Sequence, residues 1–270
     1  MTSRWGFRFL SAMAMLLILA ACPPHRVDFG KDGEAKTASG LLKRVELTEN
    51  SVISIKGDGK LGIDAPAGKG SVTLFVAVVH PASIHIEQLD FFGRPQGVLT
   101  TDGENFGLYD GAAGKFFRGP ASAANLGRFL PLVIPPRELA SLMMGRAPRI
   151  PYENATMSFD AERKVYLLKL TRGSVVQNLE VEPGSHRVLK SVITGLNTYD
   201  VEFADVETRG AISLPHKVIL NAPQAKTRVE LTWKDIAINE PPDLTMFDMT
   251  PLENVPVVDV DAEGRAVAPQ

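Results

Sequence analysis

Hydrophobic and polar residues alternate along much of this chain, which is the period expected of half-buried β-strands. Before residue 110 the alternation predicts strands at 51–56, 71–79, 83–87, 98–101 and 105–109. The run 71–79 is apolar at both alternating sets of positions. We expect its strand either at the centre of a covered sheet, or lining a cavity on one side and packing under helices on the other.

The same alternation returns after Pro151, in a series of runs separated by turn residues. It predicts strands at 156–159, 165–170, 175–181, 188–194, 199–206, 217–220 and 228–235. In the last run Val229, Leu231 and Trp233 share one face, and charged residues and Thr232 share the other. Short strands spaced roughly every 8–12 residues are typical of a sandwich or barrel, so the fold class is mainly β.

Three segments follow a helical period instead. Residues 37–47 carry Leu41, Leu42 and Val45 at near-helical spacing, which predicts a short helix. Residues 121–130 place Leu126, Phe129 and Leu130 on one face. A third helix begins at Pro136, carries Leu139, Leu142 and Met143, and ends at Gly145, the order of proline and glycine expected of a helix. The segment 251–270 has no periodic pattern and we expect it to be loose.

The N-terminal segment has the pattern of a targeting signal rather than that of a folded element. Arg4 and Arg8 precede an apolar run that begins near Phe9 and ends in Leu19-Ala20-Ala21-Cys22, as in a secretory signal. The combination resembles the lipobox of bacterial lipoproteins, which implies cleavage before Cys22 and acylation of that cysteine with chains such as palmitate. The alternatives are an ordinary signal peptide with Cys22 as a bystander, or an uncleaved span, for which the run is short against about 20 residues.

Composition narrows the surroundings of the folded part. Cys22 is the single cysteine, so no disulfide forms within the chain. The formal net charge is −2 with both signs interspersed, and no basic stripe suggests a nucleic-acid partner. Attachment to a membrane therefore depends on acyl chains.

We expect a signal peptide at 1–21, a flexible tether at 22–36, a folded domain at 37–250 and a loose tail at 251–270. In lipoproteins of enteric bacteria, a residue other than aspartate after the cysteine implies the outer membrane, and here Pro23 follows Cys22.

Motifs that suggest catalysis have simpler explanations. Residues 57–62 satisfy G-x-G-x-x-G, but the following Ile63-Asp-Ala-Pro66 cannot begin the helix that a dinucleotide site requires, so we expect a hairpin or a bulged strand. The five histidines do not fall at metal-ligand spacing. No serine or cysteine nucleophile motif is present. We therefore expect no enzyme activity, no metal and no cofactor.

Two adjacent phenylalanines, Phe91 and Phe92, lie where the pattern predicts a hairpin tip. Soluble proteins avoid exposing so much apolar area unless a partner or a membrane receives it. Alternatively, one ring folds back under the edge of the sheet.

The order of these pieces resembles the LolB family of outer-membrane lipoproteins. The resemblance covers roughly residues 37–240 and is most specific from Phe91 to Gly145. It rests on Phe92-Gly93, Leu99-Thr-Thr-Asp-Gly103, Phe106-Gly-Leu-Tyr109, Asn125-Leu126, Pro131-Leu-Val-Ile-Pro-Pro136 and Glu138-Leu-Ala-Ser-Leu-Met-Met-Gly145. It implies an open antiparallel half-barrel with short helices as a lid, whose apolar concave face receives acyl chains from a periplasmic LolA-like carrier. It also implies that Phe92 is a membrane-contacting tip.

Together these observations predict a lipid-anchored protein on the periplasmic face of the outer membrane, a monomer that binds acyl chains of lipoproteins or lipids and aids lipoprotein insertion. The expected cavity and lid residues are Val72, Leu74, Val76, Val78, Leu126, Phe129, Leu139, Leu142 and Met143. Phe75 and Val79 are the alternative set if the opposite face of their strand points inward. The expected tip residues are Phe92 and Phe91, and the expected anchor is Cys22. The alternative function is a structural or assembly lipoprotein of the envelope that uses the same fold, with a filled core, to dock a protein partner.

Overall fold

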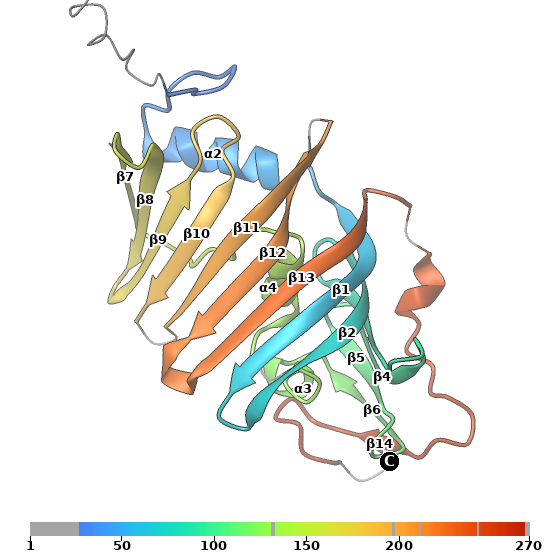
Figure 1. Ribbon diagram of the computed structural model, residues 1–270. Coiled ribbons are helices and arrows are strands. Elements are labelled where there is room, and N and C mark those ends of the chain that lie inside the picture. The colour runs from blue at the N-terminus through green and yellow to red at the C-terminus, as the bar shows by residue number, and fades with distance from the viewer. Residues whose placement is uncertain (1–26, 131–132, 196–197, 211, 242, 268–270) are drawn as a thin grey trace, which may run out of the picture.

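A computed structural model describes residues 27–130, 133–195, 198–210, 212–241 and 243–267. Its main feature is one 14-stranded sheet that curves without closing into a barrel, with a few short helices behind it (Figure 1). The two ends of the sheet, β14 and β7, are not hydrogen-bonded to each other. The predicted fold class, mainly β with an open antiparallel sheet, is confirmed.

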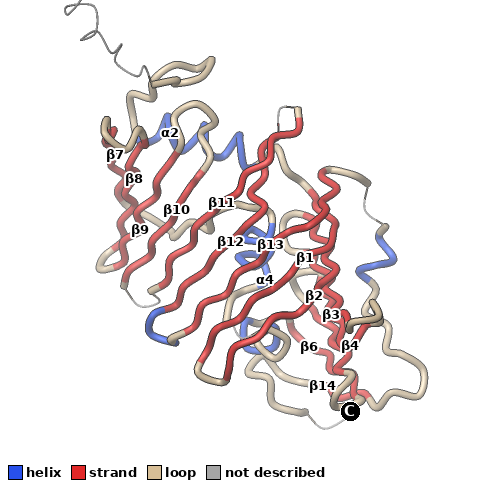
Figure 2. Tube along the Cα trace, viewed as in Figure 1, coloured by secondary structure: helices blue, strands red, loops and turns tan. Residues whose placement is uncertain are grey.

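The sheet is built almost entirely from antiparallel neighbours, with β14 and β6 as the parallel pair. Figure 2 shows the strands in red, side by side along the curved sheet. Its spatial order is β14-β6-β5-β4-β3-β2-β1-β13-β12-β11-β10-β9-β8-β7. The strands are β1 (Ser54–Ala65), β2 (Gly68–Val79), β3 (Ser83–Leu89), β4 (Pro95–Thr101), β5 (Asn105–Asp110), β6 (Lys115–Pro120), β7 (Asn154–Asp160), β8 (Val165–Arg172), β9 (Val175–Val181), β10 (Val188–Thr194), β11 (Tyr199–Arg209), β12 (Ile212–Ala222), β13 (Thr227–Ile238) and β14 (Val257–Asp259). The strand β6 was not predicted from the sequence.

The glycine-rich run 57–62 lies inside β1, as a bulged strand. The pairing of β1 with β13 shifts register between Asp58 and Gly59, and bulges bend a strand and increase its twist. A Cβ at Gly57 would lie 1.9 Å from the Asp235 carbonyl oxygen, so only glycine allows the two strands to approach this closely. The run therefore shapes the sheet and begins no helix.

The α-helices lie on one face of the sheet, which we call the inner face (Figure 1). The helix α2 (Ala38–Glu49) begins after Thr37, whose hydroxyl accepts a hydrogen bond from the Gly40 N–H. Its Leu41, Leu42 and Val45 are buried, as predicted. The helix α4 (Pro136–Met143) matches the predicted third helix, whereas α3 is limited to Ala123–Leu126.

The C-terminal segment differs from the loose tail that we expected. The short helix η2 (Leu244–Phe247) lies over the outer face, where Met246 contacts a recess formed with Ala77 and Val79. Next, β14 pairs in parallel with β6, and Val260 is only 3% exposed. A periodicity search misses such a segment because a three-residue edge strand is too short to show a period.

The second half of the expected tether is also docked. Phe29 packs against Phe159 and Tyr166, with ring centroids 5.3 and 6.1 Å away. The buried Ala35 N–H donates a 2.7 Å hydrogen bond to the Tyr166 hydroxyl. Arg44 of α2 donates to the carbonyl oxygens of residues 32 and 33. Residues 27–36 therefore lie fixed beside β7 and β8, because Phe29 and Ala35 contact aromatic side chains of these strands.

Candidate functional site

An apolar hollow on the inner face, between α4 and the sheet, is the candidate site. Its volume is about 50 Å³, and its exposed lining is entirely apolar. Three walls meet there: α4 with the loop before it, the neighbouring strands β12 and β13, and β1. The lining residues are Leu61, Leu130, Leu139, Leu142, Met143, Val218, Leu220, Val229 and Leu231.

Three of the residues predicted for the cavity, Leu139, Leu142 and Met143, line this hollow. Leu74, Val76 and Val78 of β2 are buried in the same core cluster but do not line it, and Leu126 of α3 is buried there too. Val72 and Phe129 pack against that cluster. The alternative set points the other way, since Phe75 lies against His85 and Val79 lines the recess under η2.

The strand side of the hollow was not predicted from the sequence, because it comes from β1, β12 and β13 rather than from β2. The alternation of Val229, Leu231 and Trp233 was visible in the sequence. The signal that could have found the wall is therefore the face of β13. What the sequence did not supply is that β13 lies beside β1, so that these residues come under α4.

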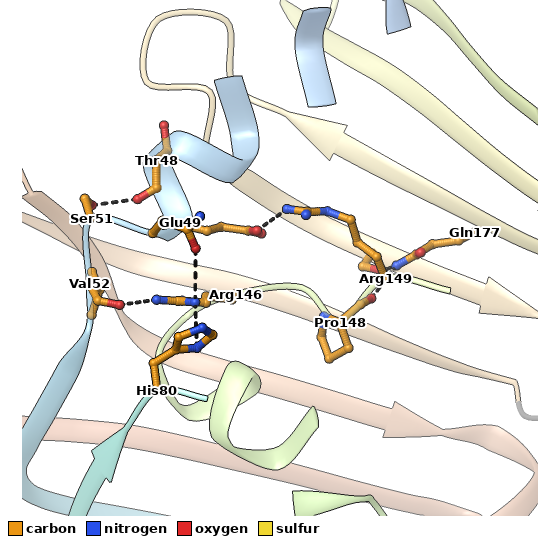
Figure 3. A network of polar contacts seen from close by, with 11 residues as sticks. Thr48, Glu49, Ser51, Val52, His80, Arg146, Pro148, Arg149 and Gln177 are labelled. Carbon is orange, nitrogen blue, oxygen red and sulfur yellow. Dashed lines mark hydrogen bonds and ion pairs between the residues drawn. The ribbon is translucent and has the colours of Figure 1, made fainter. Parts of the chain in front are cut away.

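The C-terminal end of α4 is fixed by a buried polar network (Figure 3). Arg146 donates to the Val52 carbonyl oxygen and, at 3.1 Å, contacts the His80 ring nitrogen Nδ1. Arg149 pairs with Glu49 at the end of α2. Gly145, with φ +71°, lies so close to Pro215 that a Cβ would be 2.5 Å from that ring. These contacts hold the end of α4 against α2, the β2–β3 turn and β12.

Burial decides the pKa shifts in this network. Desolvation raises the pKa of the Glu49 carboxyl above its ordinary 4.5, against the opposing effect of the Arg149 guanidinium. Desolvation and the neighbouring Arg146 guanidinium lower the pKa of His80. The group of two guanidinium ions and one carboxylate is thus a structural anchor rather than a set of free charges.

The N-terminal end of α4 has a much weaker attachment. The Tyr199 hydroxyl of β11 donates to the Glu138 carboxylate across 3.5 Å, at the limit of a hydrogen bond. Burial raises the pKa of Glu138, and burial together with the Glu138 charge raises the pKa of Tyr199. No ion pair to Glu138 occurs among the described residues. The C-terminal end of the helix is therefore held by several polar contacts, whereas the N-terminal end has one long hydrogen bond beside the buried Pro136 and Leu139.

The β3–β4 tip carries two exposed aromatic rings. Phe91 is 96% exposed and Phe92 is 77% exposed. The rings pack edge to face with centroids 5.5 Å apart, and the Arg94 guanidinium lies 5.3 Å from the Phe92 centroid. Asp90 accepts hydrogen bonds from the N–H groups of residues 92 and 94, and the second of these is the main reason why its pKa is lowered. The turn is thus ordered while its apolar rings stay in solvent.

The outer face carries a polar trio, His85, Thr100 and Glu87, whose composition resembles a catalytic set. His85 Nδ1 lies 3.0 Å from the Thr100 hydroxyl, and His85 Nε2 lies 2.9 Å from a Glu87 carboxylate oxygen. Thr100 is only 4% exposed, and this trio lies on the opposite side of the sheet from the hollow. A substrate in the hollow would not meet it. In the described part of the chain no group of three or more acidic, histidine or cysteine side chains is arranged to hold a metal.

The predicted anchor, Cys22, and the predicted signal peptide at 1–21 lie outside the described residues. Among the residues that are described, no helix is long and apolar enough to cross a membrane. The docked segment 27–36 places the start of the described chain beside β7 and β8, far from the β3–β4 tip in Figure 1.

Comparison with known proteins gives a fold and no close relative. No family model matches the sequence, and no curated protein matches it. Among solved structures, a domain described as an outer membrane lipoprotein-sorting protein from Vibrio parahaemolyticus superposes with a TM-score of 0.51 at 10% identity, covering 78% of this chain and 97% of that one. The chain shares the fold of this domain.

Two further structures are similar. A DUF1329 family protein from Desulfovibrio piger gives a TM-score of 0.53 at 10% identity, over 78% of this chain and 95% of that one. A LolA superfamily protein from Nitrosomonas europaea gives 0.49 at 12% identity, over 79% of this chain and 98% of that one. The fold that the resemblance predicted from the sequence is confirmed by the Vibrio parahaemolyticus and Desulfovibrio piger structures, and its inner face carries the hollow under α4.

Proposed function

We propose that this protein binds acyl chains of lipoproteins or lipids on its inner face beneath α4, and that it aids insertion of lipoproteins into the outer membrane. The observation that supports the proposal most is the wholly apolar lining of the hollow. A hydrocarbon chain in such a lining is removed from contact with water, which is favourable, whereas a polar substrate would find no hydrogen-bond partner there.

The hollow must enlarge before a chain enters. A volume of about 50 Å³ is well below the roughly 150 Å³ of a cavity that accepts benzene. The fixed end of α4 at Gly145 and Arg146, and the single long hydrogen bond at Glu138, define how this happens. The helix swings away at its Glu138 end and exposes Leu139, Leu142 and Met143 to the arriving chain.

The energetics suit reversible transfer without an energy source. Each methylene buried contributes about 0.8 kcal/mol, so roughly ten of them supply a gross 8 kcal/mol, from which the costs of opening α4 and ordering the chain are subtracted. The net affinity is moderate. Cargo then moves from a LolA-like carrier that binds it weakly, through this protein, to the lipid phase.

The Phe91–Phe92 tip and Cys22 are the proposed membrane contacts. Two exposed phenylalanine rings offer apolar area of the kind that interfaces and membranes bury. In this proposal Cys22 carries the acyl chains, and the protein acts as a monomer on the periplasmic face of the outer membrane. It has no catalytic role and uses no cofactor.

The small size of the hollow favours one second candidate. A structural or assembly lipoprotein would keep the inner face closed and use this fold to dock a protein partner. The two functions differ in whether acyl chains ever occupy the space under α4.

A matched pair of variants tests the proposal. Leu142→Phe places extra volume in the hollow and stabilises the closed position of α4, whereas Leu47→Phe makes the same change on α2, where Leu47 is 66% exposed. Membranes that contain the full chain are exposed to a photoreactive, clickable palmitoylated peptide, and crosslinking to this protein is quantified. We expect about tenfold lower crosslinking for Leu142→Phe than for Leu47→Phe.

Equal yields from the two variants, or no crosslinking of the unmodified protein, would reject acyl-chain binding and leave the docking function. The transfer role has a separate test. If outer-membrane lipoproteins localise normally after depletion of this protein, insertion is not its function.

A further inference from the structure

The N-terminal end of α4, which swings away from the sheet in the proposed function and is called the opening end below, carries a carboxylate beside the apolar hollow. Glu138 precedes the lining residue Leu139 and lies one helical turn before Leu142, another lining residue. Its partner Tyr199 lies two residues before Val201 on the same face of β11, and Val201 pairs directly with the lining residue Leu220. The Glu138–Tyr199 pair therefore lies at the edge of the hollow.

This carboxylate is poorly compensated for its surroundings. It is half-buried, burial raises its pKa, and its hydrogen-bond partner among the described residues is a neutral phenol 3.5 Å away. The neighbouring Arg137 is exposed and makes no ion pair with it among the described residues. A partly buried polar group with so weak a partner costs free energy, so a ligand that supplies a better hydrogen bond would bind favourably there.

The two ends of α4 differ in what a ligand's polar head would meet. At the fixed end, Arg146 already donates to Val52 and contacts Asn50 and His80, and its side chain is buried under other elements. At the N-terminal end, the described polar side chains are the Glu138–Tyr199 pair, which faces β11, and the exposed Arg137. Because the lining of the hollow is apolar, the head of an inserted chain has to stay at the opening end, beside this pair.

We propose that Glu138 and Tyr199 form a head-group subsite that selects acyl chains ending in an uncharged hydrogen-bond donor, such as an amide, over chains ending in an anion. This inference rests on the proposed function. The carboxylate accepts a hydrogen bond from the amide N–H, and the phenol donates to the amide carbonyl oxygen. A free fatty acid presents a second carboxylate instead, and two like charges in a partly desolvated site repel each other.

The test compares decanamide with decanoate, two ligands with chains of equal length that differ by one charge. The full chain in lipid nanodiscs is crosslinked with a diazirine-bearing palmitamide at pH 9, where carboxyl groups are ionised. Each ligand competes, and the ratio of the two half-inhibitory concentrations is measured for the unmodified protein, Glu138→Gln and Glu46→Gln. The last variant removes the same charge from an exposed position on α2.

We expect decanamide to compete at least tenfold better, relative to decanoate, in the unmodified protein and in Glu46→Gln than in Glu138→Gln. Partition of the ligands into lipid cancels, since it is the same for every variant. A ratio unchanged within twofold by Glu138→Gln overturns the head-group subsite and leaves acyl-chain binding intact. Failure of the palmitamide to crosslink at all overturns both. Tyr199→Phe serves as a second variant, and we expect it to weaken decanamide about threefold or more while affecting decanoate less.

Discussion

Replacing Tyr166 by phenylalanine tests whether the segment before α2 is fixed to the domain or is a free tether. In the structure the Tyr166 hydroxyl accepts the Ala35 N–H at 2.7 Å, and both residues are buried. The variant keeps the ring that packs against Phe29 and Phe159. It removes only the acceptor and leaves a buried N–H without a partner.

The expected cost is about 1–3 kcal/mol, which is the penalty for an unsatisfied buried donor. For a domain of this size each kcal/mol lowers the melting temperature by about 2–4 °C. The measurement is thermal unfolding of the full chain, combined with hydrogen exchange at the Ala35 amide. Tyr152→Phe is the control, because that residue is 47% exposed, and its hydroxyl makes no hydrogen bond to another described residue. If Tyr166→Phe unfolds within 1 °C of Tyr152→Phe and Ala35 exchanges at the same rate in both, the segment is not docked as described.

Four other changes have defined outcomes. Gly145→Ala should destabilise the protein by at least about 1 kcal/mol, measured by urea unfolding, because φ is +71° and the new Cβ would meet Pro215; unchanged stability would show that the end of α4 is not fixed there. The free energy of unfolding should fall as pH rises from 4.5 through the raised pKa of Glu138, since the folded state binds the proton of this carboxyl more tightly than the unfolded state does. Glu138→Gln should make the free energy of unfolding depend less on pH. An identical pH dependence in the variant and the unmodified protein would contradict the burial of Glu138. The double variant Phe91→Ser, Phe92→Ser should keep its melting temperature within about 2 °C of the unmodified protein, as expected for exposed positions, yet bind less to anionic-lipid vesicles. The control Leu244→Ser, at a residue 74% exposed, should bind the vesicles as the unmodified protein does. Equal vesicle binding by the two variants would show that the tip does not contact the membrane. Deleting residues 240–270 should expose the outer face around Ala77 and His85 and raise binding of a hydrophobic dye, and an unchanged signal would mean that the C-terminal segment covers nothing.

Much of the fold could be predicted because its strands alternate clearly. The run 71–79 was expected to be central or to line a cavity, and it is a central strand whose Leu74, Val76 and Val78 face the core. The helix at Pro136 was visible from its proline, its apolar face and its terminal glycine. In each case a local pattern and the tertiary environment agree.

The parts that were missed depend on long-range contacts. The tether and the tail looked polar and unpatterned, yet Phe29 finds Phe159 and Tyr166, and Val257–Asp259 finds the free edge of β6. The helix expected at 121–130 ends at Leu126, where one turn and a loop suffice to cover the core. The wall of the hollow was placed on β2 because the sequence does not show that β13 lies beside β1.

The most direct test of acyl-chain binding under α4 is to map where a photoreactive chain attaches. A palmitoylated peptide with a diazirine at the end of its chain is crosslinked to the full protein in membranes, and the modified peptides are identified by mass spectrometry. We predict attachment within α4 and on β12 and β13, at Leu142, Met143, Leu220 or Leu231. Attachment confined to the Phe91–Phe92 tip or to the outer face would contradict the account.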